Sequence, residues 1–283
     1  MEWKKASPQG AGGMLYLVPT PIGNLEDITL RALRVLREAD AIACEDTRHT
    51  RILLKHYEIH KPLVSFHQHN ERAMAERLID RVCHGEVICV VSDAGMPGIS
   101  DPGRAAVLEA RRRGAPYTVL PGASAVLTAV VAAGMGDGRF VFRGFLPRRG
   151  SERTAALEGI DRAAELSVFY EAPHRIRETL KELSARWPDR FFATARELTK
   201  QFEELHWFRG AELVLDEVEE RGEYVILIDA APFEPVSKQE VLAQIDELAQ
   251  RGLSSKEMIR QVCECTGWKK NEVYRLVLER TNP

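Results

Sequence analysis

The sequence predicts an α/β fold with a parallel sheet, and two features carry that prediction. Short runs of apolar, β-branched residues alternate with amphipathic segments from residue 14 onward, as strands alternate with helices in α/β domains. The clearest run, Val87–Val91, reads as a buried strand. It breaks at Ser92–Gly103 into a loop rich in glycine and proline, before an amphipathic helix over Ala105–Arg113. Open α/β sheets bind ligands in such loops, although a purely structural turn is the alternative.

The composition is that of an ordinary globular protein. The 283 residues, of which 45% are apolar and 29% charged, allow one large or two medium domains. The net charge of -3 excludes a protein that is basic all over, so contacts with RNA would have to use local patches. No apolar run is as long as a membrane span and no secretory signal is seen, so we expect a cytoplasmic protein.

The cysteines favour the same location. Cys44, Cys83, Cys89, Cys263 and Cys265 are scattered, odd in number and mostly set in apolar runs. This usage fits reduced thiols in the cytosol better than a disulfide framework. Because Cys263 and Cys265 have no matching second pair, we expect no metal site.

The first half predicts five strands joined by helices. A disordered leader over residues 1–13 precedes them, and the strands are expected over 14–18, 41–44, 63–66, 87–91 and 117–120. We expect Asp101 to cap the helix that follows it, with Pro102 at its first position, and Thr47 to cap an earlier helix. A first helix should bury one stripe of leucines, Leu30, Leu33 and Leu36.

The segment Ala125–Ala133 is made almost wholly of small and branched apolar residues, so it should form a helix that is buried on all sides. The glycine-rich segment 134–138 then reads as a break between domains. We therefore expect a first α/β domain over 14–134 and a second over 139–231.

In the second half, several strand-like runs follow one another without long helices between them, which predicts a mixed sheet. From residue 237 the pattern is helical to the end of the chain. Three short helices predict a small bundle or a helix-turn-helix-like lobe over 237–283.

Polar residues follow three successive strands of the first half. These clusters are Glu45–Arg48, His67–Asn70 and Ser92–Asp93. In a parallel sheet they share one edge, so we expect a ligand site there, with Asp93 accepting hydrogen bonds from ligand hydroxyl or amine groups. An enzyme that binds a dinucleotide and a nucleoside triphosphatase (NTPase) are both disfavoured, because neither Gly-x-Gly-x-x-Gly nor a Walker Gly-Lys-Ser/Thr is present.

A set of long, ordered motifs resembles the RNA-modifying branch of the tetrapyrrole methylase superfamily. The motifs are 17–29, 45–48, 92–103, 121–125 and 170–175, and the resemblance runs from about Met14 to the end of the chain. It implies a two-domain class III S-adenosylmethionine (SAM) methyltransferase fold with a small C-terminal helical lobe and SAM between the domains. It also implies a homodimer that 2′-O-methylates a cytidine ribose in the decoding region of 16S rRNA, in the 30S ribosomal subunit.

The resemblance also implies which residues hold SAM. Carried over motif by motif, they are Pro19, Ser92, Asp93, Ala94, Ile99, Ser124, Ala125, Tyr170, Glu171, Leu198 and Tyr224. One departure matters: tetrapyrrole methylases carry Gly-x-Gly-Pro-Gly-Asp after the first strand, where this chain has Val18–Gly23. That departure favours the RNA branch.

A ribose hydroxyl is a poor acid, so a base or a cation near the reacting oxygen would help. Asp46 is our first candidate to accept the proton and Arg48 to hold a phosphate; a helix cap with a surface salt bridge explains the pair equally well. Candidate RNA contacts are arginines near the start of the second domain and two histidines, namely Arg143, Arg148, Arg149, His69 and His174.

Three functions therefore compete. The first is a SAM-dependent rRNA ribose methyltransferase, the second a methylase of a tetrapyrrole, and the third a non-catalytic RNA-binding factor of ribosome assembly. The arginines and the missing glycine-rich motif favour the first over the second, and the intact polar strand ends favour it over the third.

Overall fold

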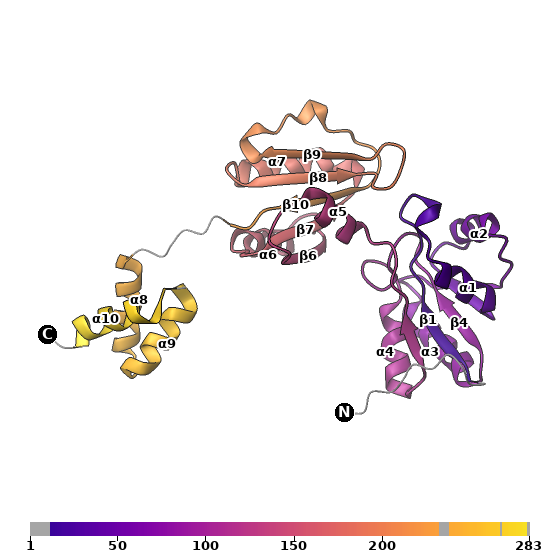
Figure 1. The fold of residues 1–283 in the computed structure, drawn as a ribbon, viewed down its shortest axis with the longest axis horizontal. Helices are drawn as coiled ribbons and strands as arrows, with labels where there is room; N and C mark the ends of the chain where they lie inside the picture. Colours follow the sequence, from indigo (N-terminus) through magenta and orange to yellow (C-terminus); the bar gives the residue numbers. More distant parts are fainter. Residues whose placement is uncertain (1–11, 232–237, 267, 282–283) are drawn as a thin grey trace. The chain divides into compact units, whose positions relative to one another are not determined.

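The computed structural model describes residues 12–231, 238–266 and 268–281. The chain divides into two compact units, Met1–Ala231 and Pro232–Pro283, which are treated separately (Figure 1). The leader expected over residues 1–13 lies outside the described residues up to residue 11. No helix in the described ranges is both long and apolar enough to cross a membrane.

The first sheet of the larger unit is wholly parallel, as the alternation of strands and helices predicts. Its five strands lie in the order β3-β2-β4-β1-β5. Their bounds are β1 (Met14–Leu17), β2 (Ala41–Cys44), β3 (Leu63–Ser65), β4 (Val87–Val90) and β5 (Tyr117–Val119). The helices between them are α1 (Leu30–Glu38), α2 (Thr47–His56), α3 (Glu71–Cys83) and α4 (Arg104–Arg113).

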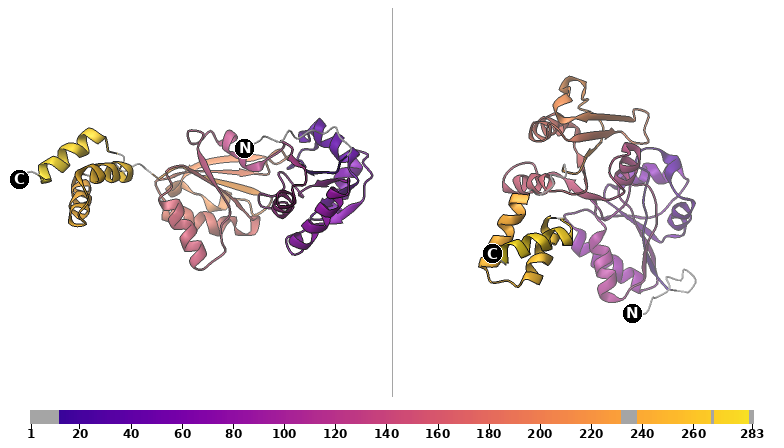
Figure 2. Two further views of the ribbon diagram at one scale, coloured as in Figure 1. Left: turned by 90° about the horizontal axis from the view of Figure 1, so that it is seen from below. Right: turned by 60° about the vertical axis from the view of Figure 1, so that its left-hand side comes forward.

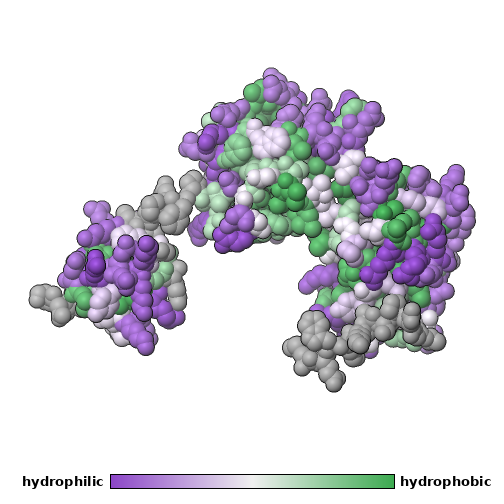
Figure 3. Space-filling model, in the orientation of Figure 1, coloured by the Kyte–Doolittle hydropathy of each residue, from purple (hydrophilic) through white to green (hydrophobic). Residues whose placement is uncertain are grey.

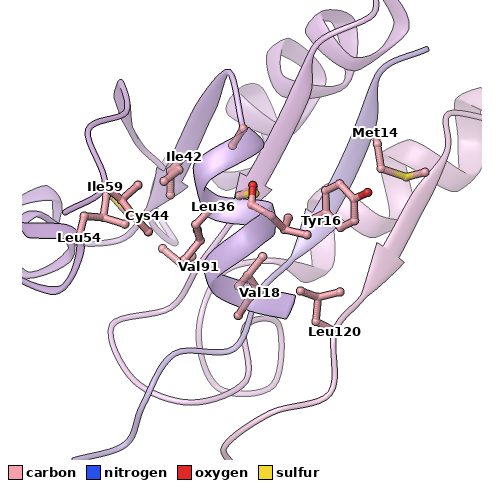
Figure 4. Packing of buried hydrophobic residues seen from close by; sticks show 14 residues of the cluster. Met14, Tyr16, Val18, Leu36, Ile42, Cys44, Leu54, Ile59, Val91 and Leu120 are labelled. Atoms are coloured by element: carbon pink, nitrogen blue, oxygen red, sulfur yellow. The ribbon is translucent and has the colours of Figure 1, made fainter. Parts of the chain in front are cut away.

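Helices cover both faces of this sheet because successive side chains of a strand point to opposite faces. Tyr16 and Val18 pack with Leu36 of α1 and Leu54 of α2 on one face (Figure 4). Leu15 and Leu17 alternate with Tyr16 and Val18 along the chain. They pack on the other face with residues of α3 and α4. The connections after β1 and β2 thus leave toward one face and those after β3 and β4 toward the other. In open α/β sheets, ligands bind at the carboxyl ends of the strands next to such a change of face.

The predictions for α1 and α2 need correction. Asp46, not Thr47, caps α2, because the Asp46 side chain accepts a hydrogen bond from the Arg48 backbone. Of the predicted leucine stripe of α1, Leu36 is buried and Leu33 packs partly buried on the same core, but Leu30 is 86% exposed. Ala32 and Val35 complete the buried side of the helix. Leu30 is the first residue of α1, directly after its cap Thr29, and so it precedes the first turn that packs on the sheet.

The second sheet is mixed, as predicted. Its order is β6-β7-β10-β8-β9, with the strands labelled in Figure 1 and the sheet drawn from two further directions in Figure 2. Strands β6 and β7 are parallel, and every other pair is antiparallel. The strands are β6 (Phe140–Phe145), β7 (Leu166–Glu171), β8 (Phe191–Arg196), β9 (Glu204–Arg209) and β10 (Tyr224–Ile228). Helices α6 (Ser151–Asp161) and α7 (Ile176–Arg186) cover one face around Phe169 and Ile226.

Helix α5 (Ala125–Ala133) covers the other face of the second sheet, where Val126 and Ala129 pack against strand residues such as Val168. By packing it belongs with the second sheet, so the change of sheet falls before α5 rather than at 134–138. The helix is not buried on all sides as predicted, since Leu127 is 55% and Val131 81% exposed. Figure 3 shows apolar atoms at the surface in this region.

The smaller unit is a three-helix lobe, as predicted from residue 237 onward. Its helices are α8 (Lys238–Gln250), α9 (Ser255–Thr266) and α10 (Lys270–Thr281). Apolar residues from all three, including Ile245, Val262 and Leu276, form one core. The lobe therefore has a hydrophobic interior of its own.

Candidate active site

A cavity of about 670 Å³ lies in the larger unit between loops of the first sheet and strand ends of the second. The loops after β4 and β5 and the start of α5 contribute Asp93, Ala94, Gly95, Met96, Ile99, Ser100, Asp101, Gly122, Ser124, Ala125, Val126 and Leu127. The loop after β1 and the second sheet contribute Ile22, Phe142, Phe145, Tyr170, Glu171, Ala172, Pro173, Glu223 and Tyr224. Eight of the predicted SAM-binding residues line it.

The loop after β4 is tied to the loop after β1. The backbone of Thr20 pairs with that of Gly95, and the Thr20 hydroxyl donates to the Ser92 carbonyl at 3.1 Å. The Ser92 hydroxyl in turn donates to the Gly95 carbonyl at 2.9 Å. Ser92 is buried and does not line the cavity, so it shapes the loop that does.

The same loop closes tightly on itself at its far end. Gly103 has φ +147, and a Cβ there would come within 2.9 Å of the Gly98 backbone nitrogen. Because Gly103 is the residue before α4, Asp101 does not cap this helix as predicted. Instead the Glu71 carboxylate, from α3, accepts hydrogen bonds from the backbone N–H groups of Gly103 at 3.0 Å and Ala105 at 3.1 Å.

Asp46 and Asp93 lie together at the edge of the first sheet, as predicted. The Asp46 backbone N–H donates to the Asp93 carboxylate at 3.2 Å. The Asp46 side chain points the other way, to Arg48, whose Nη2 lies 2.9 Å from it. This hydrogen-bonded pair lowers the pKa of Asp46 to about 2.

Carboxylates dominate the polar lining. The cavity is lined by Asp93, Asp101, Glu171 and Glu223 and, within the described ranges, by no lysine, arginine or histidine. Burial, together with the charges of Glu45, Asp93 and Glu223, raises the pKa of Asp101 to about 6. The lining is thus suited to a cation and unsuited to a free phosphate.

An aromatic group forms part of the wall from the second sheet. The Tyr170 ring lies 5.0 Å from that of Phe142 and 5.5 Å from that of Phe145, measured between centroids. Burial raises the pKa of Tyr170 to about 12, so its hydroxyl stays protonated. Such a group offers flat apolar surface to an aromatic ligand.

Other predicted SAM-binding residues have structural tasks. Glu171 is buried, accepts hydrogen bonds from Thr179 and from the Ala172 backbone, and lies 3.3 Å from Arg175. Leu198 is buried in the same hydrophobic cluster as Ile22 and does not line the cavity.

Two more predicted residues, Pro19 outside the lining and Ser124 within it, shape the backbone around the cavity. The Pro19 ring packs so closely on Gly122 that a Cβ there would lie 2.6 Å away. Ser124 caps α5, since its hydroxyl accepts from the Leu127 backbone.

The predicted RNA contacts differ in their availability. Arg143 donates to the Ser167 hydroxyl at 3.0 Å and to the Gly159 carbonyl at 3.1 Å, so its guanidinium is occupied within the fold. Arg148 and Arg149 are exposed in the loop after β6, next to Phe145 of the cavity wall. His69 and His174 are exposed as well.

Sequence reasoning missed Met96, Asp101, Phe142, Phe145 and Glu223 as lining residues. Glu223 directly precedes the predicted Tyr224, and Asp101 stood inside the central motif but was assigned to a helix cap. For Phe142 and Phe145 the available signal was their place in the strand before the arginines. They reach one wall together because the register of β6 shifts between them.

Comparisons with known proteins agree with this architecture. The family model of the tetrapyrrole (corrin/porphyrin) methylases matches residues 14–214. Among solved structures, a diphthine synthase aligns with TM-score 0.60 at 19% identity, over 77% of this chain and 90% of that chain. A uroporphyrin-III C-methyltransferase from Thermus thermophilus, complexed with S-adenosyl homocysteine, aligns with TM-score 0.54 at 20% identity, over 77% and 98%. At these identities the likeness concerns the fold.

Curated relatives are more similar. The chain is 41% identical to ribosomal RNA small subunit methyltransferase I of Halalkalibacterium halodurans, over 93% of this chain and 94% of the relative. It is 41% identical to the protein of that name from Bacillus subtilis, over 93% of each, and 39% identical to that from Escherichia coli O157:H7, over 97% and 98%. The chain therefore belongs to the tetrapyrrole methylase superfamily and, within it, to the family of ribosomal RNA small subunit methyltransferase I.

Proposed function

We propose that this chain is a SAM-dependent methyltransferase of 16S rRNA that methylates the ribose 2′-oxygen of a cytidine in the decoding region, the position of cytidine 1402. The relatives that it matches over almost their whole length are named as small subunit rRNA methyltransferases. We further propose that it acts in the cytoplasm as a homodimer on the 30S subunit.

The observation that carries the proposal is the chemistry of the cavity. A volume of about 670 Å³ is in the range of sites that enclose a nucleoside-sized ligand. The aromatic group around Tyr170 suits an adenine, and the carboxylates of Asp93 and Glu223 suit a positively charged sulfonium and ammonium. The lining therefore fits SAM, which when bound supplies a methyl group activated by its positive sulfur.

The chain has to position the acceptor and exclude water. Two oriented reactants about 3 Å apart react far faster than free ones in solution. Ile99 and Phe145 line the cavity and are 61% and 53% exposed, so they are placed to cover apolar parts of an incoming nucleotide. The target nucleotide has to leave its stack to reach this cavity.

Arginines outside the cavity favour a polynucleotide over a tetrapyrrole. Arg148 and Arg149 follow the cavity residue Phe145 and are exposed, and Arg48 is 86% exposed at the edge of the first sheet. They can hold phosphates while the acidic lining repels them from the methyl donor. A tetrapyrrole carboxylate would meet the same repulsion inside the cavity.

Transfer of label from methyl-labelled SAM tests the proposal. We expect label in 30S subunits, recovered after alkaline hydrolysis in a dinucleotide because a 2′-O-methyl group blocks cleavage of the adjacent phosphodiester, and none in a uroporphyrinogen. Label in the uroporphyrinogen would establish the tetrapyrrole methylase instead. Label in neither acceptor, nor in naked rRNA, would leave a non-catalytic assembly factor. Asp93→Ala, titrated with SAM by calorimetry, should weaken binding at least tenfold if the cavity is the SAM site.

A further inference from the structure

We infer that Asp101 is the catalytic base that takes the proton from the ribose 2′-hydroxyl; the inference rests on the proposed function and names a residue for the same site. Asp101 lines the cavity together with Asp93 and Glu223. It lies on the loop after β4, whose other end carries Asp93, so one loop places both carboxylates at the cavity.

Asp101 has no structural task that would explain its position. Asp101 lies two residues before Gly103, the cap position of α4, and the N–H groups at the start of this helix are bound by Glu71 of α3 instead. Within the described residues, the Asp101 carboxylate forms no hydrogen bond or ion pair. Its oxygens therefore remain available to a ligand in the cavity.

The backbone around Asp101 is fixed, which a base needs in order to meet a hydroxyl at hydrogen-bond distance. The Gly98 and Gly103 backbones approach each other so closely that no side chain fits at Gly103. Glu71 anchors the same point from α3. Asp101 thus sits on a closed turn held at both ends.

The surroundings of Asp101 suit a base at neutral pH. The charged groups facing it are Glu45 after β2, Asp93 after β4 and Glu223 before β10, with the protonated Tyr170 on the opposite wall. Burial and these like charges raise the pKa of Asp101 to about 6. A base is most effective when its pKa lies near the working pH, because it is then both ionised and willing to accept a proton.

Asp46, the base expected from the sequence, is less suited. Its carboxylate caps α2 and pairs with Arg48, which lowers its pKa to about 2. It also does not line the cavity. A carboxylate so stabilised as an anion is a weak proton acceptor.

The step balances without any further reactant. The 2′-oxygen forms a bond to the methyl carbon while the carbon–sulfur bond breaks, and the electron pair of that bond remains on sulfur. The 2′-O–H bond breaks and its proton goes to the Asp101 carboxylate. Release to water after transfer restores the anion.

Asp101→Asn tests the inference, because it keeps the shape and removes the base. Single-turnover transfer to 30S subunits should slow about 10² to 10⁴-fold, while the SAM Kd from calorimetry should change less than about fivefold. The wild-type rate should fall tenfold per pH unit below about pH 6, and the variant should lose this dependence. Asp216→Asn, at an exposed site on the second sheet's side of the larger unit, is the matched control.

The outcomes separate the two proposals. An Asp101→Asn protein that transfers methyl at the wild-type rate, or keeps the wild-type pH profile, overturns the role of Asp101 and leaves the proposed function intact. A wild-type protein that binds SAM but labels no ribosomal RNA overturns both. Melting curves of the variant exclude misfolding as the cause of a slow rate, and Asp101→Glu should recover part of it.

Discussion

The carboxylate of Glu71 holds the backbone of Gly103, 32 residues further along the chain, through a hydrogen bond of 3.0 Å. The same oxygen accepts from Ala105, so one side chain of α3 satisfies two N–H groups at the start of α4. This contact fixes the end of the loop that carries Asp93 and Asp101. The same contact therefore stabilises the start of α4 and holds the loop that lines the cavity.

Glu71→Ala should therefore impair both stability and SAM binding. Loss of a helix cap costs about 1–2 kcal/mol, and release of the loop should weaken SAM binding several-fold. Glu71→Gln keeps one oxygen acceptor and should lose less in both measurements. Urea unfolding and calorimetry provide the data. Glu76→Ala, an exposed glutamate on the same helix, is the control, and a Glu71→Ala protein equal to it in SAM affinity would contradict the link.

Asp101→Asn should stabilise the protein at neutral and alkaline pH. Folding raises the pKa of Asp101 from 3.8 to about 6, so its stabilising contribution is complete below pH 3.8 and is lost as the pH rises through 6. Asparagine does not ionise and avoids this loss. We expect the variant to be more stable at pH 8 by up to about 3 kcal/mol, with the difference vanishing near pH 3.8. Equal stability of both proteins across this range would show that Asp101 does not titrate abnormally.

Gly103→Ala should unfold more easily. The residue has φ +147, which alanine rarely adopts, and its Cβ would press on the Gly98 backbone. Strain of this kind costs on the order of 1–3 kcal/mol. Thermal melts measure it, with Gly12→Ala, where a Cβ meets nothing within 4 Å, as the control. An unchanged melting temperature would mean that the turn relaxes freely.

The double variant Arg148→Ala, Arg149→Ala should bind rRNA more weakly without a change in SAM affinity. Each lost phosphate contact lowers the dependence of log affinity on log salt by about one, so the slope should fall by about two. Filter binding at several salt concentrations checks this. Arg77→Ala, Arg111→Ala, on the exposed surfaces of α3 and α4, removes the same charge elsewhere. If both double variants behave alike, the loop after β6 is not a specific RNA contact.

Asp46→Ser distinguishes a helix cap from a base. Serine can still accept the hydrogen bond at the start of α2 but cannot take a proton. We expect a rate loss of no more than about tenfold, caused by the freed Arg48, well short of the loss predicted for Asp101→Asn. A rate loss as large as that predicted for Asp101→Asn would indicate that Asp46, and not Asp101, accepts the proton. Asp46→Ala, which also loses the cap, should melt at a lower temperature than Asp46→Ser.

The fold was predictable from the sequence where local patterns decide it. The continuous apolar run around Leu15, Tyr16 and Leu17 marks a strand buried on both faces, and the structure confirms a parallel sheet there. The mixed second sheet and the helical lobe were predicted on the same grounds. Motif order and strand ends likewise pointed to Asp93, Tyr170 and Tyr224, which line the cavity.

What local patterns could not supply were contacts between distant segments. Nothing in the sequence near Asp101 shows that Glu71 replaces it as the cap of α4. Nor does the sequence around Arg143 show that its guanidinium donates hydrogen bonds to Ser167 and Gly159. The exposure of Leu127 and Val131 depends on how much of α5 the second sheet covers, which no periodicity within the helix reports.

The closed turn between Gly98 and Gly103 has a thermodynamic consequence for ligand capture. A loop that is already ordered gives up little chain entropy when a ligand arrives, so association need not be coupled to folding. The heat capacity change on SAM binding should then reflect only the apolar surface that the ligand covers, without the larger contribution of a segment that orders on binding.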